Sequence, residues 1–451
     1  MPPKQEAVII GGGLAGCEAA WQLLRRGCRV TMYEMKPGRY SPAHTSPLLA
    51  ELVCSNSLRS ADPTSAAGML KEEMRSLNSL FMAAAEATSV PAGRSLAVDR
   101  RRFSQYIQER LSGFAGQFQL LHREIREIIQ DKPVIIATGP LTSDALAAEI
   151  QRLTGAGHLY FYDAIAPIII TDSIDLTQTF WASRYDHPQG EANGDYLNCP
   201  LDETAYNDFR EAILSAAKVP LRDFENPQYF EGCLPVEILA ERGPRTLLFG
   251  PMKPVGLTDP RTGRQPYAVI QLRKENRAGT LLNMVGFQTK MTWPEQQRVF
   301  RMIPGLSGAE FARYGSIHRN TFLNAPVLLT ERLQLRSRPQ LLFAGQLTGV
   351  EGYVESAAMG LYAGLSLWFF LNGRDLSPPP DTTAMGALIS YLTTGGKGTF
   401  QPMNVNHGIL RPLTVRLKKS ARGMEYARRS RADLLAWKIA HGIEDRTGSP
   451  S

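Results

Sequence analysis

A glycine-rich turn near the start of the chain constrains the fold more than any other feature. Residues 8–10 read Val-Ile-Ile, the apolar character of a buried strand, and lead into glycines with the G-x-G-x-x-G spacing. The first glycine of this motif permits a tight turn, the second lets a pyrophosphate approach the backbone, and the third lets a helix pack on the strand. The pattern predicts a helix over 14–26 whose N-terminus faces a diphosphate. The predicted turn comprises Gly11, Gly12, Gly13, Leu14, Ala15 and Gly16.

An acidic residue completes this unit. A second β-type run over 29–34 ends at Glu34, where a carboxylate can accept hydrogen bonds from an adenosine ribose. A glycine-rich turn without a ligand would explain the spacing alone, but not the strand, helix, second strand and terminal acid together. A further buried run over 133–139 ends in Thr138-Gly139, beside the expected cofactor. The sequence therefore predicts a dinucleotide site.

A similar pattern of buried strand, glycine turn and helix occurs again near the C-terminal end of the chain. A buried run over 340–344 ends at Gly345 and Gln346, and Gly352-Tyr353 opens a helix rich in Ala, Gly and Leu. Such an arrangement is typical of FAD-binding proteins, in which the helix N-terminus helps to hold the flavin end. Gln346 stands where many flavoproteins carry an aspartate for the ribityl chain, and an amide can still hydrogen-bond its hydroxyls.

Composition limits the class of protein. The 451 residues are too many for one ordinary core, and 43% hydrophobic with 21% charged residues is typical of a soluble globular protein. We expect no segment of transmembrane length. Five cysteines without a C-x-x-C pair argue against a disulfide framework or a metal site and favour the reducing cytoplasm. The net charge of +7 favours an anionic partner such as nucleic acid, although a solvated basic surface explains the charge nearly as well.

The texture of the sequence changes at about residue 167. Strand-like runs at 168–171, 196–199, 246–249, 267–272 and 283–287 alternate with Pro- and Gly-rich turns, with one helix predicted over 203–218. One long helix is predicted earlier, over 66–86. We therefore expect an α/β protein, a Rossmann-like FAD-binding domain with a large inserted α+β substrate domain. The expected boundaries are 1–166 and 337–451 for the FAD-binding domain and 167–336 for the insertion.

Two cysteines and a basic stretch are candidate functional features. Cys54 lies among Ser and Asn before a helix, and Cys233 lies between Gly232 and Leu234-Pro235. Each could be a reactive thiolate, and the alternative is a packed buried thiol. The stretch 411–431 is densely basic, which fits either a phosphate-binding face or a solvated helix. The cations chosen as candidate RNA contacts are Lys418, Lys419 and Arg422.

With these pieces placed, the chain resembles the folate- and FAD-dependent tRNA (uracil-5-)-methyltransferases, the TrmFO family. Matching stretches run in family order over nearly the whole chain. ELVCSNSLRS and YFEGCLPVE are specific to this family, whereas the glycine motif is not. Other matching stretches are GGGLAGCEAAWQL, VPAGRSLAVDR, IATGPLTS, YAVIQLR, HRNTF, FAGQLTGVEGYVESAAMG and FQPMNVN.

The resemblance implies a reaction and its participants. It implies methylation of C5 of a uridine in the tRNA T loop, uridine-54, with methylenetetrahydrofolate as carbon donor. Reduced FAD would carry the methylene and supply the hydride, and NADH or NADPH would re-reduce it. Cys233 would attack C6, Cys54 would remove a proton or protect the flavin, and Tyr353 would stack on or near the flavin ring. His318 and Arg319 could contact folate or uridine, or be structural. No membrane, DNA or metal is implied, and the protein would be cytoplasmic.

Two other classes of function stay open at this point. A flavin oxidoreductase acting on a small molecule would not need ELVCSNSLRS or the basic stretch. A flavin-containing RNA-binding protein without catalysis would not need reactive cysteines. Within the methyltransferase interpretation, a uridine of ribosomal RNA is an alternative target that no single residue excludes.

Overall fold

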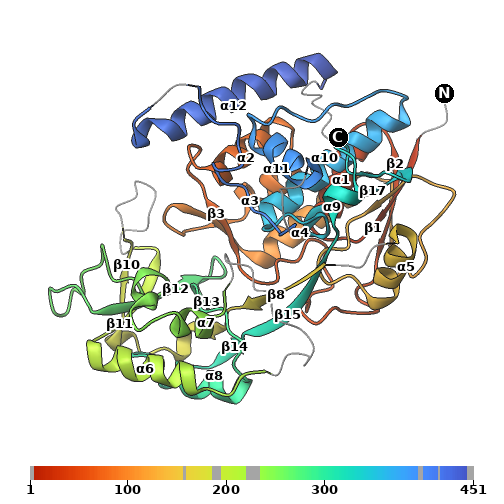
Figure 1. The fold of residues 1–451 in the computed structure, drawn as a ribbon. Coiled ribbons are helices and arrows are strands. Elements are labelled where there is room, and N and C mark those ends of the chain that lie inside the picture. Colours follow the sequence, from red (N-terminus) through yellow and green to blue (C-terminus); the bar gives the residue numbers. More distant parts are fainter. Residues whose placement is uncertain are drawn as a thin grey trace.

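The fold is organised around a six-stranded sheet that combines strands from the first part of the chain with two strands from residues 334–343 (Figure 1). The computed structural model describes residues 5–155, 159–184, 194–219, 234–394, 400–414 and 417–443. Within these ranges the sheet has the order β16-β17-β7-β1-β2-β6, parallel except for β16 at its edge. Its strands are β1 (Glu6–Ile10), β2 (Arg29–Glu34), β6 (Phe118–His122), β7 (Val134–Ile136), β16 (Gln334–Leu335) and β17 (Arg338–Phe343).

The three central strands are apolar on both faces because helices cover both faces. Ile9 pairs with Ile135, which pairs in turn with Leu342, and all three are fully buried. Continuous apolar runs are the sequence pattern of parallel strands buried on both sides. The three runs predicted at 8–10, 133–139 and 340–344 are therefore neighbours in one sheet, although up to 330 residues of sequence separate them.

Helix α1 (Leu14–Leu24) packs closely against α10 (Tyr353–Leu371). A Cβ on Gly360 would lie 2.2 Å from the Ala15 carbonyl oxygen, and one on Gly364 would lie 2.8 Å from that of Ala19. Small residues thus bring the two helix backbones together. At 19 residues, α10 is long and apolar enough to cross a membrane, contrary to the expectation from the sequence, but 78% of its most apolar window is buried in the core.

Further helices complete the first domain. The predicted helix over 66–86 is instead two helices, because Asn78 adopts a left-handed conformation and Ser79 caps the second one through its hydroxyl. A small sheet of β3 (Ser57–Ser60), β4 (Ser89–Val90) and β5 (Ser95–Val98) lies beside them. The helices are α2 (Ala66–Ser76), α3 (Leu80–Ala87), α4 (Arg100–Ser112), α5 (Asp144–Thr154), α9 (Ala325–Leu328), α11 (Ala384–Thr394) and α12 (Lys419–His441).

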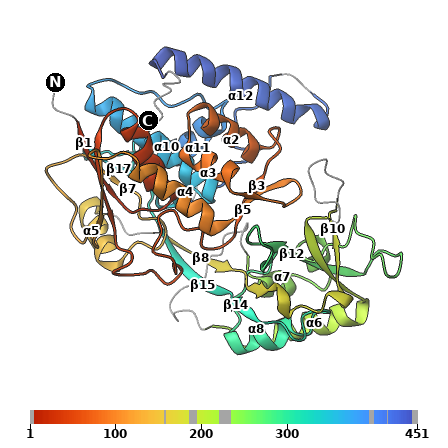
Figure 2. The same ribbon diagram turned by 180° about the vertical axis from the view of Figure 1, so that it is seen from behind.

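The insertion forms a second body joined to the first by a two-stranded ribbon of β8 (Leu159–Ile165) and β15 (Ser316–Phe322) (Figures 1 and 2). Its antiparallel sheet has the order β10-β11-β12-β13-β9-β14. Helices α6 (Glu203–Ser215), α7 (Val236–Glu241) and α8 (Trp293–Phe300) pack with it around a separate core. The strands are β9 (Ile168–Ile170), β10 (Phe180–Ala182), β11 (Tyr196–Leu201), β12 (Ala268–Lys274), β13 (Leu281–Met284) and β14 (Phe311–Arg313).

The structure confirms the predicted fold class, an α/β domain with an inserted α+β domain. The strand predicted at 246–249 is wrong, because these residues form a 3-10 helix in which Thr246 N–H bonds to the Gly243 carbonyl. Gly-Pro pairs at 243–244 and 250–251 leave only one turn between them. The second core extends from Ile169 to Phe311, and the first resumes at Phe322. The boundaries at 166 and 336 stay a proposal.

The basic helix α12 is fixed to the first domain by buried polar groups. Glu73 on α2 accepts hydrogen bonds from the Ala384 and Met385 N–H groups at the start of α11, at 2.6 and 2.7 Å, and from the Ser430 hydroxyl of α12 at 2.6 Å. Lys438 donates to the Ser76 carbonyl at 2.5 Å. One carboxylate therefore links three helices.

The ionisation of Glu73 should make the stability of the protein depend on pH. Burial raises the pKa of Glu73 to about 7 from its ordinary value of 4.5, although the three hydrogen bonds oppose this shift. Because the folded state then holds the proton over a range where the unfolded state has lost it, Glu73 should lower the unfolding free energy by about 3 kcal/mol as pH rises from about 4.5 to 7. Urea titrations across this range should show a smaller decrease for Glu73→Gln than for the wild type. An equal decrease in both would contradict the assignment.

Candidate active site

The glycine turn forms a cradle between β1 and α1. A Cβ on Gly16 would lie 1.9 Å from the Gly11 carbonyl oxygen, and one on Gly11 would lie 2.6 Å from that of Ala137. Gly11 also has a φ of +105°, which strongly favours glycine. A Cβ on Gly13, by contrast, would meet nothing nearer than 4.0 Å. Gly11 and Gly16 are thus required by packing, while Gly13 faces open space at a helix N-terminus, as a pyrophosphate site needs.

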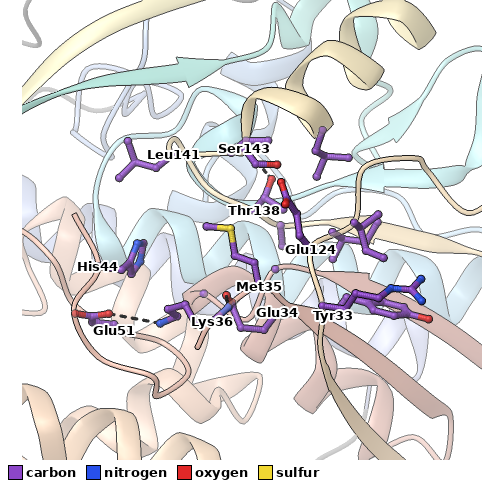
Figure 3. A pocket seen from close by; sticks show the side chains of 18 residues that line it. Tyr33, Glu34, Met35, Lys36, His44, Glu51, Glu124, Thr138, Leu141 and Ser143 are labelled. Atoms are coloured by element: carbon purple, nitrogen blue, oxygen red, sulfur yellow. Dashed lines mark hydrogen bonds and ion pairs between the residues drawn. The ribbon is translucent and has the colours of Figure 1, made fainter. Parts of the chain in front are cut away.

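Glu34 is held beside this cradle by the backbone. Its Oε2 accepts from the Gly12 N–H at 2.8 Å and its Oε1 from the Lys36 N–H at 2.9 Å. A carboxylate oxygen can accept a second hydrogen bond, so each keeps capacity for a ribose hydroxyl. Figure 3 shows Glu34 and Thr138 at one cavity, with Lys36 and Glu51 forming an ion pair at 3.5 Å nearby. The role of Glu34 as a ribose ligand stays a prediction.

A second cavity lies beside the first. Leu141 lines both cavities, and the adjacent residues Ala43 and His44 line one each. Gln346 and Gly352 line the second cavity, at the end of β17 and the start of α10. The residues present therefore fit an elongated dinucleotide, with the glycine cradle and Glu34 at one end and the α10 N-terminus at the other.

Local contacts explain the glycines of this second end. A Cβ on Gly345 would lie 2.8 Å from the Ala15 Cβ, and Gly352 has a φ of +112°. The Gln346 side-chain nitrogen donates to Glu351 Oε2 at 2.6 Å, so its amide oxygen can accept a hydrogen bond from another donor. Gly139 follows the cavity-lining Thr138 with a φ of +70° but does not itself line either cavity.

Cys54 and Tyr353 form a compact hydrogen-bonded unit in the second cavity. The Tyr353 oxygen accepts from the Cys54 N–H at 2.7 Å and the Ser55 N–H at 3.2 Å, and lies 2.9 Å from Cys54 Sγ. Since both backbone groups are donors, the single phenolic proton is available for the sulfur. Burial, and then the neighbouring Cys54, raise the pKa of Tyr353 well above its usual value. Tyr353 therefore stays protonated and directs its proton toward Sγ.

Arginines of two domains fix the loop that carries Cys54. Arg100 donates to the Leu52 carbonyl at 2.9 Å and pairs with Glu275 of the insertion at 2.7 Å. Arg273 of β12 donates to Asn56 Oδ1 at 2.8 Å and to the Ser55 hydroxyl at 2.9 Å. Sequence reasoning missed these residues, although VPAGRSLAVDR and YAVIQLR contain both arginines. The Cys54 loop is thus positioned by the FAD-binding domain and the insertion together.

The other described cysteines differ from Cys54. Cys17, Cys28 and Cys199 are buried, and burial raises the pKa of each, to about 11 for Cys28 and about 12 for Cys199. Cys54 is partly exposed. Cys233 lies outside the described residues, as do the side chains of His318 and Arg319. Within the described ranges no group of three His, Cys, Asp or Glu residues could hold a metal ion.

The predicted RNA-contacting cations lie at the N-terminal end of α12. Lys418 is exposed, and Arg422 is exposed with its Nε bonded to the Leu417 carbonyl at 3.1 Å. The Lys419 side chain lies outside the described part of the chain. Other cations of the same helix are engaged, since Arg428 pairs with Glu425 at 2.6 Å and Arg429 donates to the Pro412 carbonyl. Of the two whose side chains are described, neither Lys418 nor Arg422 lines the cavity with Cys54.

Comparison with known proteins places the chain in a family. The sequence model of the family described as glucose inhibited division protein A matches residues 6–375. The chain is 59% identical over 444 residues to the methylenetetrahydrofolate–tRNA-(uracil-5-)-methyltransferase TrmFO of Syntrophus aciditrophicus, covering 98% of this chain and 100% of that one. It is 58% identical over 429 residues to the TrmFO of Geobacter sulfurreducens, covering 95% and 98%.

A solved structure shares the fold. GidA of Aquifex aeolicus, in its form II crystal, superposes with a TM-score of 0.70 at 17% identity, covering 98% of this chain and 74% of that one. This likeness concerns the fold alone, whereas the relatives above match along nearly their whole length. The motifs described above, the two-domain fold and the cavity with Cys54 agree with that match. The chain belongs to the TrmFO family of methylenetetrahydrofolate–tRNA-(uracil-5-)-methyltransferases.

Proposed function

We propose that this chain methylates C5 of a uridine in tRNA, uridine-54 of the T loop, with methylenetetrahydrofolate as carbon donor. FAD, when bound, supplies the reduced carrier of the one-carbon unit, and NADH or NADPH supplies the electrons. The observation that carries the proposal is the place of Cys54, a partly exposed thiol in the cavity that Gln346, Gly352 and Tyr353 line. We further propose that the protein acts in the cytoplasm.

Two cysteines have distinct tasks in this proposal. C5 of uracil is a poor nucleophile until a group adds to C6, and a thiolate suits that addition. We assign the addition to Cys233. We assign proton removal at C5, or protection of the cofactor, to Cys54, whose sulfur accepts a hydrogen bond from the Tyr353 hydroxyl. Arg100 and Arg273 keep the Cys54 loop in place and are positioning residues.

Replacement of Tyr353 by Phe should impair the Cys54 loop more than the fold. The change leaves the Cys54 and Ser55 N–H groups without their acceptor and removes the proton directed at Sγ. We expect a loss of about 1–3 kcal/mol in stability and a methylation rate reduced roughly tenfold. Tyr362→Phe, on the same helix as Tyr353, is the matched control, because the Tyr362 hydroxyl donates to the Glu331 carbonyl away from the site. Equal rates for both variants, per folded molecule, would contradict the assignment.

Replacement of Lys418, Lys419 and Arg422 together by Ala should weaken the salt dependence of tRNA binding. Each phosphate contact contributes about 0.9 to the slope of log affinity against log salt, so a change of up to about 2–3 is expected. Arg428→Ala serves as control, because Arg428 already pairs with Glu425 on the same helix. An unchanged slope in the triple variant would make this end of α12 a solvated surface only.

A carbon-source assay tests the function itself. The purified protein, loaded with FAD, is incubated with NADPH, methylenetetrahydrofolate labelled in its methylene carbon, and an RNA hairpin with the T-loop sequence. We expect label in 5-methyluridine, and none when cytidine replaces the target uridine. Label in a ribosomal RNA hairpin but not in the T-arm hairpin would favour the alternative target. NADPH oxidation without label in either RNA would favour a small-molecule oxidoreductase.

A further inference from the structure

An exposed stack of aromatic rings lies on the insertion domain. Trp293, the first residue of α8, is 64% exposed, and its ring stacks on Tyr314 with centroids 5.7 Å apart and planes 18° apart. Tyr314 stacks in turn on Phe311, at 5.1 Å and 23°. Phe311 reaches the buried Phe300 of the insertion core. A ladder of rings therefore extends from the core and ends in solvent at an indole.

Buried hydrogen bonds hold this ladder rigidly. Gln296 donates its amide to the carbonyls of Met291 and Gly315, at 2.8 and 2.9 Å, and accepts from the Gly315 N–H at 2.7 Å. Gln296 is fully buried, so these bonds tie α8 to the chain that follows Tyr314. A ring fixed in this way loses little conformational freedom when a flat ligand stacks on it.

Short stretches of the chain link the ladder to the site already described. Gln288, five residues before Trp293, lines the cavity that contains Cys54. Burial lowers the pKa of Arg313, next to Tyr314, and the nearby Arg100, which donates to the Cys54 loop at Leu52, lowers it further. Two short stretches, 288–293 and 313–314, thus connect the cavity with the exposed indole.

We infer that Trp293 is the stacking platform for a nucleobase of the RNA loop that carries the target uridine, an inference that rests on the proposed function. Proteins recognise RNA loops by stacking unpaired bases on aromatic side chains, and such stacking tolerates any base. The protein carries a net charge of +7, which suits a polyanionic partner. The occupant is therefore an unpaired base of the T loop that carries the target uridine.

Binding of a T-arm RNA hairpin to the FAD-loaded protein tests this inference. Trp293→Ala should weaken binding about 5- to 150-fold, the range measured for loss of one stacked base. Trp293→Phe should retain most of the affinity. The slope of affinity against salt should not change, because stacking involves no phosphate. Phe370→Ala, which removes a 40% exposed aromatic ring of α10 on the other domain, should bind like the wild type.

Three outcomes would overturn the inference. Equal affinity of Trp293→Ala and wild type would exclude stacking. A salt slope that falls together with affinity would indicate a charge effect. A change in sedimentation of Trp293→Ala would show instead that the ring joins two copies of the chain. The carbon-source assay distinguishes failure of this inference from failure of the proposed function. If the wild type methylates the RNA and Trp293→Ala binds RNA equally well, only the stacking platform is refuted. If Trp293→Ala weakens RNA binding but the wild type does not methylate, only the proposed function is refuted.

Discussion

Gly13→Glu protein should fold normally and purify without flavin. A Cβ at Gly13 meets no atom nearer than 4.0 Å, and its φ of −77° suits any residue, so the change should not disturb the fold. The new carboxylate, however, would project into the space that a pyrophosphate needs and repel it. We expect a melting temperature close to that of wild-type apoprotein and no flavin absorbance.

Two companion variants make this prediction specific. Gly16→Val should lose both flavin and stability, since its Cβ would lie 1.9 Å from the Gly11 carbonyl oxygen and force α1 away from β1. Gly38→Glu adds the same charge at an exposed residue outside the cavity and should retain flavin. Full flavin occupancy in Gly13→Glu would place the cofactor elsewhere.

Cys54→Ala should abolish methylation, with a loss of at least about 100-fold, while flavin and tRNA remain bound. The reason is that the sulfur near the Tyr353 hydroxyl is removed, whereas the backbone bonds of the loop stay. Cys199→Ala, at a fully buried thiol of the insertion, should lose stability but keep its activity per folded molecule. The measurements are thermal melting and the methylation rate.

Cys233→Ala should differ from Cys54→Ala in a trapping experiment. With 5-fluorouracil in the target position, fluorine cannot leave C5 as a proton does, so the thiolate that attacked C6 stays attached to the RNA. We expect no adduct with Cys233→Ala and an adduct with Cys54→Ala. The opposite pattern would reverse the two roles.

Local motifs were predictable from the sequence because neighbouring residues alone determine their conformation. The turn at Gly11–Gly16 and the strand β7, which ends at Ile136 just before Thr138, are each defined by residues within one short segment. The apolar runs that contain Ile9, Ile135 and Leu342 indicated that the three strands belong to one sheet. They did not indicate which residues pair across the strands. Local pattern alone failed at 246–249, where a short apolar run between two Gly-Pro pairs closes into one helical turn.

The support of the site was not predictable in the same way. Arg100 meets Glu275, and Arg273 meets Asn56, across 175 and 217 residues of sequence. Only the docking of the insertion against the FAD-binding domain brings these residues together. The contact of Tyr353 with Cys54, separated by 299 residues, is of the same kind. Sequence patterns name residue types, whereas tertiary packing decides which of them share a loop.

Mapping 5-methyluridine in RNA from cells that lack this protein tests the central claim most directly. The proposed function predicts that uridine-54 of tRNA is unmethylated in these cells while 5-methyluridine in ribosomal RNA is unchanged. The wild-type gene should restore the tRNA methyl group, and a gene encoding Cys54→Ala should not. Persistence of the tRNA methyl group together with loss of one in ribosomal RNA would contradict the assignment of tRNA as the substrate.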